Sequence, residues 1–129
     1  MSQAAPRTVL SFLTVFVLAM ALYPVIALSV WDLIAGGGLQ RPLLLIGAML
    51  CAQLAAVILV WRRWRWARWL VILLLLLDIP MYMAALPGAL FRNLAFPALS
   101  LLQFGLHFAA VFLLFTPSAA AWLGRTRPR

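Results

Sequence analysis

The stretch Trp61-Arg62-Arg63-Trp64-Arg65-Trp66-Ala67-Arg68-Trp69 decides the architecture of this chain. It contains four of the ten arginines and four of the six tryptophans, and long apolar runs lie on both sides of it. In membrane proteins arginine is concentrated in cytoplasmic loops, and tryptophan gathers at the level of the lipid headgroups. The stretch therefore predicts a short cytoplasmic hairpin between two membrane-spanning helices, where its arginines and tryptophans anchor the topology and contact anionic headgroups.

The composition excludes an ordinary soluble domain. The chain has 129 residues, of which 67% are hydrophobic and 9% are charged, whereas charged residues make up about 25% of a soluble domain. A net charge of +8 invites a nucleic-acid-binding interpretation, but the arginines flank apolar runs instead of forming a soluble basic face. We therefore expect a single all-α membrane domain that binds no nucleic acid.

Four apolar segments approach the roughly 20 residues that cross the hydrocarbon core. They cover residues 8–30, 43–61, 70–86 and 97–115, and a basic tail follows at 124–129. They predict an antiparallel bundle of four transmembrane helices. The first segment has a competing interpretation as a signal peptide, because Ala19-Met20-Ala21 resembles a cleavage site. Its apolar run continues beyond that site, which favours a retained helix.

Proline and small residues predict where the helices bend, end and pack. We expect Pro24 to kink the first helix, and Pro87-Gly88 to end the third helix before an outer loop that runs to Pro97. In the second segment, small residues recur at every fourth position: Gly47, Cys51 and Ala55, with Ala48, Ala52 and Ala56 beside them. Small residues at this spacing let transmembrane helices approach closely, so they predict a packing face. Residues 118–123 are expected to form a short helix along the inner surface, with Trp122 as its interfacial anchor.

The distribution of arginine predicts the orientation. Eight of the ten arginines fall on the side of the hairpin and two, Arg41 and Arg92, on the other; the eight are Arg7, Arg62, Arg63, Arg65, Arg68, Arg125, Arg127 and Arg129. Such a bias over short loops places both chain ends in the cytoplasm. The chain lacks lysine and is rich in Ala, Leu and Arg, a composition typical of a GC-rich bacterial gene. We therefore expect a multi-pass protein of the bacterial inner membrane.

Polar residues near the middle of three segments form the candidate site. Gln53, Asp78 and His107 are expected at similar depth in the second, third and fourth helices. Helical spacing adds Tyr82, Gln103 and Ser100 toward the outer side, and Tyr23 lies in the outer half of the first helix. These residues predict a polar seam inside the bundle, which we define as Gln53, Asp78, His107, Tyr82, Gln103 and Tyr23.

The seam has two interpretations. Its side chains can pair with one another and fix the packing of the helices without further function. Alternatively they relay protons or bind a polar group, because ionisable residues inside a membrane usually mark functional sites. Asp78 and His107 in contact would titrate as a coupled pair.

The sequence gives little support for a metal, cofactor or catalytic site. One His, one Cys and two Asp are too few and too scattered to predict a metal site or a bound haem, and we expect no cofactor. No phosphate-binding loop or nucleophile motif occurs.

Three classes of function remain open. The first is a non-catalytic protein that binds another protein or its own copies, as an accessory subunit or as an immunity protein against a membrane-acting toxin. Its outer contacts would be Trp31, Asp32 and Arg92. The second is a small proton-coupled transporter or channel that uses Asp78 and His107. The third is an enzyme acting on lipid-linked substrates, for which no catalytic constellation is found. The sequence favours the first class.

Overall fold

The protein is described from a computed structural model that places residues 5–31, 40–90 and 94–124. The helices in these ranges are α1 (Arg7–Ser29), α3 (Gln40–Trp61), α4 (Ala67–Leu90), α5 (Ala95–Leu114) and α6 (Pro117–Gly124). Within the described ranges, four helices (α1, α3, α4 and α5) are long and apolar enough to cross a membrane. The all-helical fold and the four apolar spans that the sequence predicts are confirmed.

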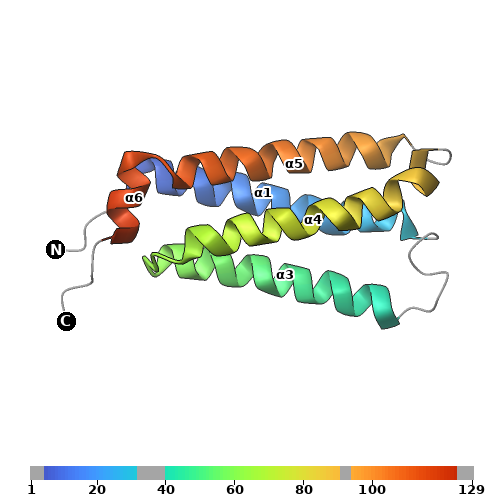
Figure 1. Cartoon of the computed structure of the whole chain (residues 1–129), viewed down its shortest axis with the longest axis horizontal. Helices are drawn as coiled ribbons and strands as arrows, with labels where there is room; N and C mark the ends of the chain where they lie inside the picture. Colours follow the sequence, from blue (N-terminus) through green and yellow to red (C-terminus); the bar gives the residue numbers. More distant parts are fainter. Residues whose placement is uncertain (1–4, 32–39, 91–93, 125–129) are drawn as a thin grey trace.

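The four long helices lie side by side along the longest axis of the molecule (Figure 1). Helix α1 packs most extensively against α5, whereas α3 lies at the edge and contacts α4 and α1. Helix α6 lies at the end of the bundle that also holds the turn between α3 and α4 (Figure 1). A hydrogen bond of 2.8 Å between the hydroxyls of Thr8 and Ser118 joins the start of α1 to α6. We call this the arginine-tryptophan end.

The hydrophobic core is concentrated toward the arginine-tryptophan end. There all five described helices contribute side chains to one cluster, whose largest buried members are Phe12, Phe16, Leu114 and Trp122. Near the other end a second cluster contains only Ile26, Val30 and Phe96 among its buried residues. The bundle is therefore well filled at one end and less filled at the other, and this difference leaves room for a cavity.

Several helix ends differ from the predicted ones. Helix α4 begins at Ala67 and continues through Pro87 and Gly88 to Leu90, so the prediction that Pro87-Gly88 ends the third helix is wrong. A proline inside a helix removes one backbone hydrogen bond, but within a membrane the remaining bonds still favour the helix over open backbone. Helix α5 begins at Ala95, so the predicted outer loop is much shorter than 87–97.

Proline also lies inside other helices without ending them. Helix α1 passes through Pro24 and α4 through Pro80. Pro42 and Pro97 lie in the first turn of α3 and α5, where a helical N–H has no partner within the helix and its loss costs little.

The turn between α3 and α4 is held by the side chain of Arg63. Arg63 has φ 62, in the left-handed region that costs most residues about 1–2 kcal/mol. Its guanidinium carbon lies 3.8 Å from the centre of the Trp122 ring. Residues Pro117–Gly124 are helical, close to the predicted 118–123, but Trp122 is only 7% exposed. The expectation that it serves as an interfacial anchor is wrong, because Arg63 and the core enclose its ring.

Only some of the small residues of α3 pack against the rest of the chain. Gly47, Cys51 and Ala55 are all exposed, and a Cβ added at Gly47 would meet nothing within 4 Å. Gln53 and Ala56 of the same helix are buried instead. The helix therefore turns the face with Gly47, Cys51 and Ala55 outward, whereas Ala52 and Ala56 beside it pack against the core.

Candidate functional site

Asp78 of α4 and His107 of α5 meet in the interior of the bundle. The His107 Nδ1 atom lies 3.6 Å from Asp78 Oδ2, and the two side chains are only 1% and 8% exposed. The distance suits an ion pair when the imidazole is protonated, but it is too long for a hydrogen bond. The sequence placed these residues at similar depth, and the structure brings them together.

The surroundings of His107 are largely apolar on the side of α1. The Phe16 ring meets the imidazole edge-on with 5.4 Å between ring centroids, and Phe12 stacks on Phe16 at 5.3 Å. Both imidazole nitrogens of His107 lack a hydrogen-bond partner among the described residues. Asp78 is therefore the polar group of the bundle that His107 approaches, and the aromatic pair holds its ring in place.

Gln53 does not join the pair by a hydrogen bond. Its side chain is fully buried in α3, and neither its amide nitrogen nor its amide oxygen has a hydrogen-bond partner in the described part of the chain. Buried side-chain polar atoms are paired in the large majority of cases. The expected depth of Gln53 along its helix was not enough to predict a partner for its side chain.

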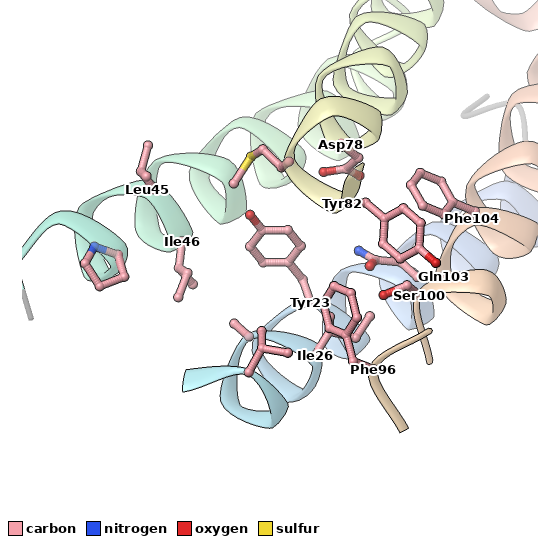
Figure 2. A pocket seen from close by; sticks show the side chains of 14 residues that line it. Tyr23, Ile26, Leu45, Ile46, Asp78, Tyr82, Phe96, Ser100, Gln103 and Phe104 are labelled. Atoms are coloured by element: carbon pink, nitrogen blue, oxygen red, sulfur yellow. The ribbon is translucent and has the colours of Figure 1, made fainter. Parts of the chain in front are cut away.

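The other members of the seam surround a cavity of about 110 Å³ on the side away from the arginine-tryptophan end. Figure 2 shows the Tyr23 ring in the middle of this space, between Ile46 of α3 and Tyr82 of α4, with the Asp78 carboxylate at its edge. The cavity is lined by α1, α3, α4 and α5, through Tyr23, Ile26, Ala27, Val30, Pro42, Leu45, Ile46, Asp78, Met81, Tyr82, Phe96, Ser100, Gln103 and Phe104. The seam therefore divides in two: Tyr23, Tyr82 and Gln103 face the cavity with Asp78, whereas Gln53 and His107 lie outside its lining.

Tyr82 stands in a group of aromatic rings at the wall of the cavity. Its ring stacks on Phe96 at 5.5 Å and 14°, and it meets Phe104 edge-on at 5.3 Å and 82°. The sequence analysis did not single out Phe96 or Phe104. Phe96 continues the helical stripe of Ser100, Gln103 and His107 at a spacing of four, so the periodicity that found the polar residues could have found it.

The cavity carries one formal charge. Asp78 is the only carboxylate among its described lining residues, and no arginine lines it. Asp78 Oδ2 and the amide nitrogen of Gln103 are buried and have no hydrogen-bond partner among the described residues. The cavity thus combines an apolar wall with acceptor and donor groups on one side, an arrangement typical of small-molecule sites.

The arginine-tryptophan stretch is largely on the surface. Trp61, Trp64, Trp66 and Trp69 are all more than half exposed. Arg62 and Arg65 are exposed, whereas Arg63 and Arg68 are half-buried. The Arg68 guanidinium lies 5.7 Å from the ring of Trp69 and 5.6 Å from that of Phe115. Exposed tryptophans beside arginines suit a lipid headgroup region, and their anchoring role stays a prediction.

The predicted outer contacts are only partly described. Trp31 is half-buried, just beyond the end of α1, whereas Asp32 and Arg92 lie outside the described residues. The described residues contain no group of three or more His, Cys, Asp or Glu side chains that could hold a metal ion. No protein-family model, curated protein or solved structure matches this chain. Any function must therefore be argued from the site itself.

Proposed function

We propose that this protein is a small proton-coupled transporter or channel of the bacterial inner membrane, in which Asp78 and His107 take up and release the proton. In this proposal the chain is an antiparallel bundle of four transmembrane helices with both ends in the cytoplasm. The arginine-rich side faces the cytoplasm, as the positive-inside bias predicts. The cavity then lies in the outer half of the bundle.

The observation that carries the proposal is the 3.6 Å approach of His107 to Asp78 at the edge of the cavity. A carboxylate and an imidazole in contact hold zero, one or two protons, so the pair gains or loses charge without a change of fold. Tyr23 of α1 and Tyr82 of α4 also line the cavity, and α3 contributes no titratable side chain to its lining. A solute in the cavity thus meets Asp78 directly, and His107 lies behind it.

The unpaired polar atoms of the seam support a functional role over a purely structural one. Polar residues that serve only to fix helix packing should satisfy one another inside the bundle. Here His107, Gln53 and Gln103 keep buried polar atoms without a hydrogen-bond partner among the described residues. Groups left in this state favour a site that exchanges its partners, as a proton or solute pathway does.

Proton flux into liposomes tests the proposal. The full chain is reconstituted around a trapped pH-sensitive dye, and the rate of internal acidification is measured after an external acid jump. We expect the parent to conduct protons, and Asp78→Asn and His107→Gln to lower the rate at least tenfold. Thr14→Val is the matched control, because Thr14 is exposed and its hydroxyl donates to the Leu10 carbonyl of its own helix.

Two outcomes overturn the proposal. One is a parent that conducts no more protons than empty liposomes; the other is flux that survives in both variants. The size-exclusion profile of each variant shows whether the bundle is intact, and His107→Gln keeps the test informative if Asp78→Asn does not fold. Absent flux from an intact parent would return the non-catalytic binding role, with contacts at Trp31, Asp32 and Arg92, to first place.

A further inference from the structure

The chemistry of the cavity wall indicates which class of solute it takes. One side is formed by the Asp78 carboxylate and by the aromatic ring of Tyr82, which packs against other rings. The other side is formed by aliphatic side chains, including Ile26, Leu45 and Ile46. Positive charge is attracted both by a carboxylate and by the face of an aromatic ring. Aliphatic walls bury an apolar body. One molecule that satisfies both sides is an organic cation with an apolar portion.

We propose that the cavity binds an amphipathic organic cation, with its positive group between Asp78 and Tyr82 and its apolar body against α1 and α3. This inference rests on the proposed function, because it names the solute that exchanges with the proton. Asp78 Oδ2 is buried and has no hydrogen-bond partner among the described residues, and its neighbour His107 carries a positive charge only when it is protonated. When His107 is neutral, a cation therefore supplies the counter-charge that this wall of the cavity lacks.

Charge excludes an anionic solute from this cavity. The chain has no lysine, and no arginine is among the described residues that line the cavity, so an anion there would meet the Asp78 carboxylate without a compensating lysine or arginine from this lining. Two like charges a few ångströms apart in a medium of low dielectric constant repel by several kcal/mol. A neutral polar solute would leave the ionised carboxylate buried without a counter-charge whenever His107 is neutral, which also costs free energy.

The cavity opens on the side of the bundle. Leu45 of α3 and Met81 of α4 line it, and they are 56% and 43% exposed. In a bilayer these exposed apolar side chains contact lipid, so an amphipathic molecule dissolved in the membrane reaches the cavity between α3 and α4. The open side of the cavity thus matches a solute that partitions into lipid.

Binding of the cation and binding of a proton compete in this arrangement. The carboxylate of Asp78 attracts the cation only when it is ionised, so a pair that holds an extra proton must release it to water as the cation enters. His107 of α5 lies within ion-pair distance of the carboxylate, and Tyr23 of α1 is the other titratable group from a neighbouring helix that lines the cavity. Cation affinity should therefore fall as the pH is lowered.

Equilibrium dialysis of radiolabelled benzyltrimethylammonium against the purified full chain in detergent tests the inference. We expect saturable binding that weakens at least tenfold in Asp78→Asn and about threefold to tenfold in Tyr82→Leu, which keeps an apolar side chain but removes the ring. Thr14→Val should bind like the parent. Neopentylbenzene, the uncharged carbon analogue of the cation, should not compete.

Each contrary outcome has a distinct meaning. Competition by neopentylbenzene, or undiminished binding to a folded Asp78→Asn protein, shows that charge is not recognised and overturns the inference. Displacement of the label by a short-chain quinone with no effect of Asp78→Asn points to a neutral ligand and also overturns it. Absence of binding by a parent that conducts protons in liposomes overturns the cation alone, whereas absence of both overturns the proposed function.

Discussion

At the scale of single residues, the account depends on the contact between Asp78 and His107. The two side chains come from different helices, are almost fully buried, and approach to 3.6 Å. Phe16 packs against the imidazole and restricts its movement. Packing thus fixes the positions of the two side chains, and in this account only their protonation state changes.

A double-mutant cycle measures this contact. Asp78→Asn, His107→Gln and the double variant are unfolded by SDS from mixed micelles, and the free energies of unfolding are compared. We expect a coupling energy of about 0.6 kcal/mol, the average for interhelical polar contacts in membranes. Strictly additive effects of the two substitutions would show that the side chains do not interact in the folded protein.

The sequence located this pair because an ionisable residue inside an apolar span is conspicuous. It did not reveal that Gln53 has no hydrogen-bond partner among the described residues, because two side chains at similar depth meet only if their helices are also rotated toward each other. The rotation of each helix decides the rest, and rotation depends on packing partners from other helices. The aromatic residues around Tyr82 were missed for a related reason. An apolar side chain that lines a cavity cannot be told from one that faces lipid or packs in the core when the whole segment is apolar.

At the scale of helices, segment length and composition predicted that each helix exists more accurately than they predicted where it begins and ends. Pro87 was expected to stop the third helix, but α4 continues to Leu90. Gly47, Cys51 and Ala55 were expected to pack inside the bundle, but they lie on its surface. Both errors have one cause. A local sequence pattern shows which conformations a segment can adopt, but contacts with neighbouring helices decide where a helix ends and which of its faces is buried.

The turn between α3 and α4 offers a test at this scale. Arg63 combines a left-handed backbone with a stacked guanidinium. Arg63→Ala keeps the strained backbone and loses the stacking on Trp122, worth about 0.5–1 kcal/mol. Arg63→Gly loses the stacking but also removes about 1 kcal/mol of strain. We therefore expect the glycine variant to be the more stable of the two by about 1 kcal/mol in SDS unfolding.

The neighbouring Arg62 supplies the control, because it is exposed and has no stacked ring among the described contacts. Arg62→Ala should change the free energy of unfolding by less than about 0.5 kcal/mol. If Arg63→Ala were equal to or more stable than Arg63→Gly, the turn would not be strained at this residue.

At the scale of the whole molecule, the orientation in the membrane decides on which side the cavity lies. Spheroplasts are treated with a membrane-impermeant maleimide after Cys51→Ser has removed the single native cysteine. We expect Trp64→Cys in the hairpin to be labelled only after lysis, and Ala35→Cys, between the first and second apolar segments of the sequence, to be labelled without it. The reverse pattern would place the arginine-rich side outside and contradict the proposed topology.

The uneven packing of the bundle connects its structure with the proposed function. The five described helices share a core at the arginine-tryptophan end, whereas the cavity occupies the less filled end. Asp78 lies where these two regions meet, in reach of both the cavity and His107. In the proposed function, this position lets a change of charge at Asp78 act on the buried imidazole of His107 without a rearrangement of the core.

The central claim is that Asp78 gains and loses a proton inside the folded bundle. Infrared difference spectroscopy of the reconstituted parent minus Asp78→Asn, recorded as the pH is lowered, detects this directly through the carboxylic acid C=O band. The account predicts that this band appears with acidification, and that its titration moves in His107→Gln because the coupled partner is gone. A difference spectrum without the band at any pH at which the protein stays folded would contradict the account.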